Sequence, residues 1–169
     1  MSRDPESARR DRHELLAELS DAVRANQRAT DVVDDLAGQL LGVNRSDGRC
    51  LDILDQRGRL SAGELAREAS LTSGAITAVI DRLEQAGYVQ RVADPRDRRR
   101  VLVETTDRTK DMTEELFGPL AAQAMPLFER YSDQQLELLI EFHRLGVELQ
   151  ERHAEFLRAR LRTRERKPA

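Results

Sequence analysis

Arginines gathered around one predicted turn are the residues of this chain best suited to a definite chemistry. Two Val-rich runs, residues 88–92 and 101–105, bracket residues 93–100, whose Asp-Pro dipeptide is typical of a turn. Between Arg91 and Arg100 the chain has five arginines and two aspartates, a local charge of +3 in a chain of net charge -3. Cations that neutralise phosphates release counterions, which drives binding to nucleic acid. The pattern predicts a β-hairpin with a phosphate-facing basic tip; a solvated surface turn is the alternative for such a hairpin taken alone.

The composition favours one soluble, mainly helical domain with long helical extensions. A hydrophobic content of 39% is enough for a core, while 4% aromatic residues favour helices over a sandwich or barrel. The chain has no apolar run of 18 residues, and residues 2–12 are polar. We therefore expect no membrane partner, no signal peptide and a cytoplasmic location. The overall acidity argues against a histone-like polycation and leaves local docking of a shaped surface.

Two short helices are predicted directly before the hairpin. Ser61 and Glu64 form a capping box that begins a helix running to about Ala69. Thr72 caps a second helix whose apolar residues recur three and four positions apart, and Gly87 ends it. Two short helices followed by a hairpin are the elements of a winged helix-turn-helix. In that fold the second helix enters the major groove, and the hairpin reaches the backbone or the adjacent minor groove.

Long amphipathic helices are predicted on both sides of this region. Leu and Val at helical spacing indicate a helix over residues 13–41. A second helix is expected over residues 107–131, kinked or interrupted at Pro119 and Pro126, and a capping box at Ser132 begins a final long helix. The apolar face of the final helix is wider than one neighbour covers. We expect one stripe to pack within the subunit and the other against a second copy.

The expected fold class is mainly α with a small β-hairpin: a winged helix-turn-helix DNA-binding lobe plus long N- and C-terminal dimerisation helices. The segments are a disordered N-terminus at 1–12, a dimerisation helix at 13–43, the DNA-binding lobe at 44–106, dimerisation helices at 107–160 and a basic flexible tail at 161–169. The cations of the tail could touch DNA, but we favour a solvated helix end whose charges suit the helix dipole.

Two motifs in the lobe resemble those of a known family. Residues 81–87 read DRLEQAG and residues 94–99 read DPRDRR, similar to the "DRLE-x-x-G" and "D-x-x-D-x-R" motifs of the MarR family of bacterial transcription regulators. The resemblance extends over about residues 13–160 and is most specific over 60–106. It implies a homodimer on a palindromic operator in double-stranded DNA. Because many members are repressors released by small phenolic or lipophilic ligands, it also implies a ligand-responsive repressor.

The resemblance assigns roles to individual positions. Ser73 and Thr77 would face bases or phosphates from the recognition helix, and Arg82 would reach a phosphate at its edge. Arg96 and Arg98 would lie near the wing tip, with Arg96 the better candidate for the minor groove. A further set is expected to hold the shape of the wing rather than contact DNA: Asp81, Asp97 and Arg99. For the two aspartates the reason is that an exposed carboxylate repels phosphate.

The recognition helix departs from a base-reading pattern. It has small residues on its exposed face and no Arg or Asn before Arg82, so bidentate pairing with a purine is not available there. We hypothesise that specificity comes from close approach to the groove, from methyl contacts of Ala75 or Ala78, and from Arg96 reading the shape of the minor groove.

Two small residues near residue 50 raise separate questions. Gly48 stands where family members commonly have a bulky apolar residue, which leaves either ligand space near the dimerisation helices or closer helix packing. Cys50 is the single cysteine, so it forms no intrachain disulfide. Because it lies on a helix expected to be packed and has no flanking His, we expect an inert buried thiol rather than a redox sensor.

Motifs for enzymatic chemistry are missing from the sequence. It contains no phosphate-binding loop, no serine-hydrolase elbow and no zinc-protease motif, and its three histidines do not share a metal-ligand spacing. We expect no enzyme, no cofactor and no metal. A helical interaction module whose winged domain binds protein is the alternative function. A DNA binder differs from it by losing affinity steeply with salt.

Overall fold

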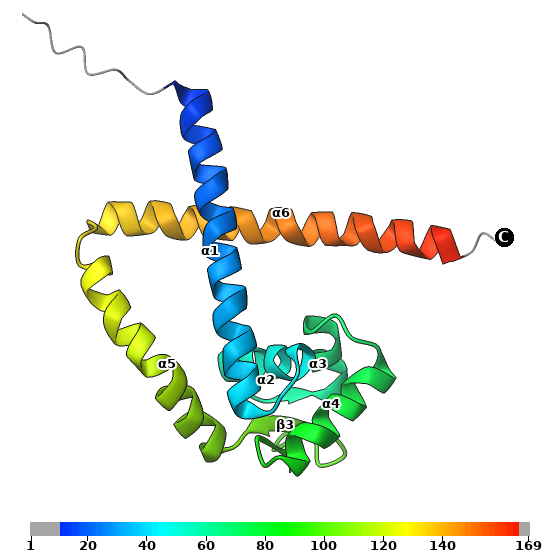
Figure 1. The fold of residues 1–169 in the computed structure, drawn as a ribbon. Coiled ribbons are helices and arrows are strands. Elements are labelled where there is room, and N and C mark those ends of the chain that lie inside the picture. The colour runs from blue at the N-terminus through cyan, green and yellow to red at the C-terminus, as the bar shows by residue number, and fades with distance from the viewer. Residues whose placement is uncertain (1–10, 166–169) are drawn as a thin grey trace, which may run out of the picture. The chain divides into compact units, whose positions relative to one another are not determined.

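The computed structural model describes residues 11–165 and has two compact units, Met1–Leu116 and Phe117–Ala169 (Figure 1). The expectations for residues 1–10 and 166–169 lie outside the described residues. Within residues 11–165, no helix is long and apolar enough to cross a membrane.

Four helices of the first unit precede the hairpin: α1 (Arg12–Leu41), α2 (Arg45–Arg57), α3 (Ala62–Glu68) and α4 (Ser73–Gln85). Side chains cap the start of each of these helices, and the caps of α3 and α4 are those that the sequence predicts. Asn44 and Asp47 form a reciprocal capping box at α2, and Ser61 and Glu64 form another at α3. The Thr72 hydroxyl accepts a hydrogen bond from the third backbone amide of α4.

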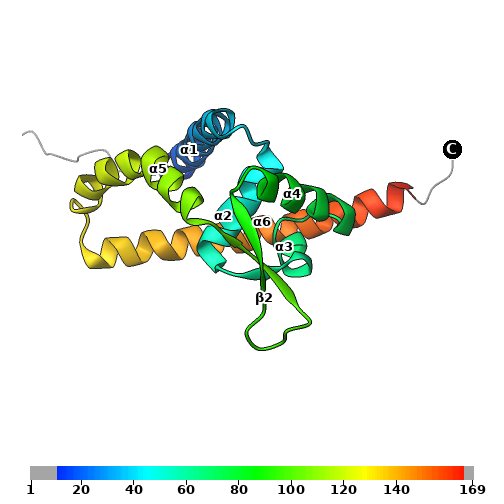
Figure 2. The same ribbon diagram turned by 90° about the horizontal axis from the view of Figure 1, so that it is seen from below.

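The three strands form one antiparallel sheet in the order β1-β3-β2, with bounds β1 (Leu60–Ser61), β2 (Val89–Ala93) and β3 (Val101–Thr105). Gly87, at a φ of 77°, turns the chain from α4 into β2 in a left-handed conformation that favours glycine. In the hairpin Arg91 lies opposite Val103. The hairpin, called the wing below, projects from the lobe (Figure 2). The predicted winged helix-turn-helix is confirmed.

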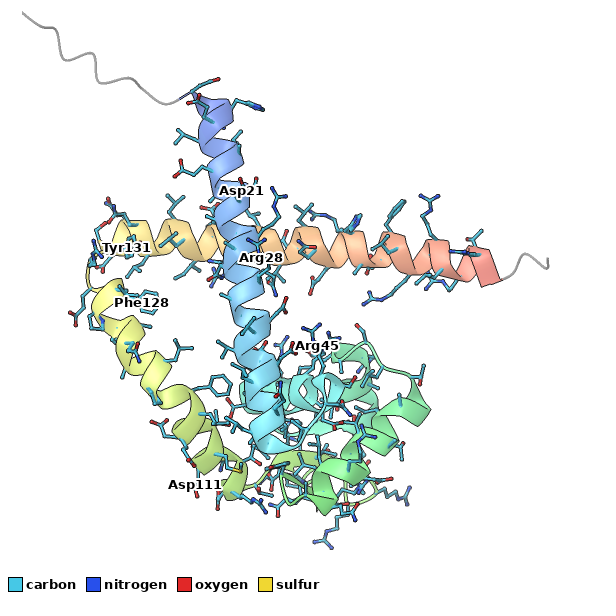
Figure 3. All side chains as sticks on the ribbon, viewed as in Figure 1. Asp21, Arg28, Arg45, Asp111, Phe128 and Tyr131 are labelled. Carbon is cyan, nitrogen blue, oxygen red and sulfur yellow. The ribbon has the colours of Figure 1, made fainter. Side chains whose placement is uncertain are left out.

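The core of the first unit lies between α2, α3, α4 and the sheet. The largest fully buried side chains belong to these elements: Leu54, Leu65, Ile76, Ile80, Leu83, Val89 and Val103. Tyr88 is buried at the start of the wing, and its hydroxyl donates to the Leu41 carbonyl at 2.8 Å. Arg45, at the start of α2, pairs with Asp31 of α1 at 3.4 Å (Figure 3). These contacts connect the end of α1 to the winged lobe.

Helix α5 (Asp107–Phe128) begins in the first unit and ends in the second, where α6 (Asp133–Glu165) follows it. The expected interruption at Pro119 and Pro126 is wrong, because α5 continues through both prolines. Each proline removes one backbone donor, but the surrounding helix surface is mostly exposed, where water can satisfy the freed carbonyl. Ser132 and Gln135 form the predicted capping box before α6.

Large apolar side chains remain exposed on the long helices. No residue of α1 is buried, and none is buried between Asp133 and Arg164 of α6. Exposed apolar residues also gather near the end of α5, where Phe128 and Tyr131 keep 52% and 47% of their surface (Figure 3). Apolar surface of this extent on helices indicates that something else covers it.

Candidate nucleic-acid interface

Helix α4 has a buried apolar face and an exposed outer face of small residues. Its buried residues are Ile76, Val79, Ile80 and Leu83. Ser73, Thr77 and Ala78 are exposed on the outer face, and Ala75 is half-buried. Thr77 Oγ1 donates to the Ser73 carbonyl at 3.1 Å, so this hydroxyl is held against its own helix. The outer face has little side-chain bulk, which lets the helix backbone come close to a groove floor.

The arginines of the wing fall into two groups. Arg91 Nη2 lies 2.5 Å from Asp81 Oδ1, and Arg91 also pairs with Glu84, so β2 is tied to α4. These hydrogen bonds, that of Asp81 first, raise the pKa of Arg91. Arg100 lies 3.4 Å from Glu64 of α3. Arg91 and Arg100 therefore connect the wing to α4 and α3. Asp81, which was expected to brace the wing, is one of the partners of Arg91.

The arginines at the wing tip are placed differently. Arg96, Arg98 and Arg99 are exposed and make no ion pair with any other described residue. Because none of their guanidinium groups is neutralised by a nearby carboxylate, the tip carries the available positive charge of the wing. These are the groups that can bind phosphate or enter a groove.

Aspartates set the shape of the wing tip through backbone amides. Asp94 is buried, and its Oδ1 accepts from the Arg96 amide at 2.8 Å. Asp97 Oδ1 accepts from the Arg99 amide at 3.0 Å, and the Arg100 amide donates to the Asp97 carbonyl at 2.9 Å. Asp97 thus holds the turn as expected, while Arg99 takes part through its amide. The Asp94-Pro95 dipeptide served as a turn signal in the sequence, but no bracing role was predicted for Asp94.

An ion pair between a buried aspartate and a half-exposed arginine joins α2 to the last turn of α4. Asp47 is 4% exposed, and both of its oxygens accept from Arg82, Oδ1 from Nη2 at 2.5 Å and Oδ2 from Nε at 3.3 Å. The hydrogen bonds to Asp47 are the main reason that the pKa of Arg82 is raised. The Arg82 side chain is still 48% exposed. From the sequence, Arg82 was expected to reach a phosphate at the edge of the recognition helix. Its pairing with Asp47, which lies 35 residues earlier in the chain, was not predicted.

Comparison with known proteins decides the family. A sequence model of the MarR family matches residues 43–101. The chain is 36% identical over 152 residues to the uncharacterized HTH-type transcriptional regulator YcgE of Bacillus subtilis, covering 90% of this chain and 99% of that protein. The chain belongs to the MarR family. It is therefore a DNA-binding transcription regulator.

Two further comparisons give a similar transcriptional repressor and a similar fold. The chain is 34% identical over 107 residues to the HTH-type transcriptional repressor Rv2887 of Mycobacterium tuberculosis, covering 63% of this chain and 77% of that protein. The fold is similar to the crystal structure of NadR in complex with 4-hydroxyphenylacetate, with a TM-score of 0.56 and 19% identity, covering 85% of this chain and 96% of that one.

Gly48 and Cys50 lie on α2 of this MarR family member. A Cβ added at Gly48 would meet nothing within 4 Å, so tight packing against other parts of the chain does not explain the glycine. Cys50 is fully buried, and burial, together with the charge of Asp47, raises the pKa of its thiol to about 11. Since the thiolate is the reactive form, burial and the raised pKa both disfavour reaction of Cys50 at neutral pH. Among the described residues, no cluster of metal-ligating side chains occurs.

Proposed function

We propose that this MarR family regulator is a homodimeric repressor that binds a palindromic operator and is released by a small phenolic or lipophilic ligand. Its observed wing carries the proposal. The wing projects from the lobe that also contains α4 (Figure 2), and its three tip arginines make no ion pair among residues 11–165. The outer face of α4 is formed by small residues. A basic wing next to a slim helix fits duplex DNA, in which the wing and helix engage adjacent grooves.

In this proposal the site residues have two roles: some contact DNA, and others hold those residues in place. Ser73 and Thr77 approach bases or phosphates from α4, and Arg82 reaches a phosphate beside its last turn. Arg98 supports the wing tip on the backbone, and Arg96 reads the minor groove, whose negative potential is strongest where it is narrow. The bracing residues hold these groups in place: Asp81, Asp97 and Arg99.

The dimer would form through the long helices. Their exposed apolar residues include Leu15, Leu19 and Val23 on α1 and Leu145, Leu149 and Phe156 on α6. A second copy of the chain presents the same faces, so a two-fold dimer can cover both sets at once. Two-fold symmetry in turn explains a palindromic operator, with half-sites about one helical turn apart.

Several observations support repression and ligand control. Rv2887 is named a repressor, and NadR was solved with a phenolic acid, 4-hydroxyphenylacetate. In this chain, the open space at Gly48 on α2 is where such a ligand would gain room. The names of the relatives describe transcription regulators, which supports a role without an enzymatic step.

The proposal is tested by DNA binding as a function of salt. Fluorescence anisotropy would be measured with duplexes from upstream of the protein's own gene, for wild type, the double variant R96Q/R98Q and the control R24Q. Arg24 is an exposed arginine of α1 paired with Asp21. Each lost phosphate contact lowers the slope of log affinity against log salt by about 0.9, so the wing variant should show a shallower slope and R24Q the wild-type slope.

Two results would contradict the proposal. Unchanged affinity and slope in the wing variant would exclude the wing from the DNA contact. Failure of wild type to bind any duplex in dilute buffer would favour the alternative, in which the winged domain binds protein. Release of bound DNA on titration with 4-hydroxyphenylacetate or related phenols would support ligand control.

A further inference from the structure

The pairing of Asp47 with Arg82 is unequal in exposure. The carboxylate is buried in the first turn of α2, with 5% of its side-chain surface exposed, whereas the guanidinium side chain is 48% exposed. Asp47 Oδ2 also accepts from the Asn44 amide at 3.3 Å, in the capping box of α2. The carboxylate is therefore fixed by its own helix, and it is the mobile arginine that gains an orientation from the contact.

The contact occupies one edge of the guanidinium. Nε and Nη2 both donate to Asp47, which is the bidentate arrangement that fixes the plane of an arginine. Within the described residues, Nη1 of Arg82 makes no hydrogen bond. An arginine has five donors in a rigid fork, so the Nη1 side remains available to a second acceptor while the first is kept.

The position of Arg82 limits what that second acceptor is. Arg82 lies in the last turn of α4, on the helix whose outer face is formed by Ser73, Thr77 and Ala78. Asp81, its exposed neighbour, is paired with Arg91 of the wing, so its charge is partly neutralised. An anion that arrives along the outer face of α4 therefore meets an oriented cation. In duplex DNA that anion is a backbone phosphate.

Holding Arg82 in advance has an energetic consequence. A free arginine side chain loses rotamer entropy when it is fixed. Here folding has already fixed the side chain, so phosphate binding does not bear this cost again. We propose that Asp47 is a positioning residue for DNA binding, holding the Nε–Nη2 edge of Arg82 so that its Nη1 edge faces a phosphate at the end of the recognition helix. This inference rests on the proposed DNA contact of Arg82.

The alternative is a brace between α2 and α4 that has no part in DNA binding. Lysine at position 82 separates the two roles, because one ammonium keeps the charge but cannot span a carboxylate and a phosphate in the fork geometry. D47N keeps the shape of residue 47 and an oxygen for the Asn44 amide but removes the charge. The matched control is R57K, at an exposed α2 arginine that lies 3.5 Å from Glu68.

The experiment measures affinity for operator DNA against salt for wild type, R82K, D47N, the double variant D47N/R82K and R57K. Circular dichroism and thermal unfolding report folding of each. We expect R82K and D47N each to weaken binding roughly tenfold and to lower the salt slope by about 0.9 per subunit, or about 1.8 per dimer. The double variant should show no further loss, since both changes remove the same contact. R57K should match wild type.

Each contrary result has a separate meaning. If R82K and D47N keep the wild-type slope while wild type binds normally, the pair is a brace and the inference is wrong. If R82K lowers the slope and folded D47N does not, Arg82 binds phosphate without help from Asp47, which also overturns the inference. Failure of wild type to bind DNA rejects the proposed function itself. Because Arg82 is half exposed, R82K tests the contact even if D47N does not fold.

Discussion

The winged lobe buries its apolar side chains within one chain, and the long helices α1 and α6 do not. In the lobe, Leu54, Leu65 and Ile80 are each at most 1% exposed. On α6, Leu138, Leu145 and Leu149 are 64%, 56% and 59% exposed, although the helix has 33 residues. Helices draw most of their stability in proteins from packing of an apolar face. The lobe therefore forms its apolar core within one chain, whereas the apolar faces of α1 and α6 require another surface to cover them.

Charged residues show the same division inside the lobe. Three arginines of the lobe are paired with carboxylates: Arg91 with Asp81, Arg100 with Glu64 and Arg82 with Asp47. The tip arginines make no ion pair among the described residues. The arginines that connect elements of the lobe have their carboxylate partners within the chain, while the arginines of the wing tip remain available to a ligand. We propose that this ligand is DNA for the wing and another copy of the chain for the long helices.

The largest expected effect comes from placing charge on the exposed apolar face of α6. We expect L145E/L149E to abolish the dimer at micromolar concentration and to weaken operator binding more than a hundredfold, because burying an unpaired carboxylate costs several kcal/mol. Sedimentation and anisotropy measure the two effects. The control Q150E adds the same kind of charge at an exposed polar position of α6 and should stay dimeric. A dimeric L145E/L149E would show that this face of α6 is not the interface.

The next effect tests the closed core of the lobe. Leu65 is fully buried, so L65A should lower the free energy of unfolding by about 2–5 kcal/mol through lost burial and an internal cavity. Val101, on β3, is 54% exposed, and V101A should cost less than about 1 kcal/mol. Urea denaturation at fixed protein concentration compares the two. Equal losses would mean that the lobe core is not the main source of its stability.

Burial of Cys50 predicts a pH dependence for the same core. The folded chain raises the thiol pKa from 9.0 to about 11, so the folded state holds its proton more tightly than the unfolded state. This contribution is fully present below pH 9 and is lost as pH rises toward 11, by about 2–3 kcal/mol in total. Denaturation of wild type and C50A between pH 8 and pH 11 measures it. Wild type should lose more stability with pH than C50A, and parallel profiles would contradict the buried-thiol interpretation.

Most of the fold could be predicted from the sequence, because its signals lie close together in the chain. Pairs of residues that are distant in the sequence could not be predicted. Ser61 and Glu64 are three residues apart, so their capping box could be predicted, and Gly87 marks a turn by its conformational freedom. Asp47 and Arg82 are 35 residues apart, and any carboxylate of the chain was a partner in principle. The interruption expected at Pro119 does not occur, and the helix there is exposed, so water can reach the carbonyl that the proline leaves without a donor.

The smallest expected effect comes from two glycines, one in each of the two regions: Gly48 in the lobe and Gly146 on α6. A Cβ at Gly48 of α2 or at Gly146 of α6 would meet nothing within 4 Å in the single chain. Alanine in an open helical position stabilises by about 0.5–1 kcal/mol, so G48A should raise the free energy of unfolding by that amount. If a partner helix covers α6, G146A should gain less or lose stability, because the added methyl meets the partner. Equal gains, measured by denaturation at the same high protein concentration, would place the partner away from Gly146 and move the interface to another stripe of α6.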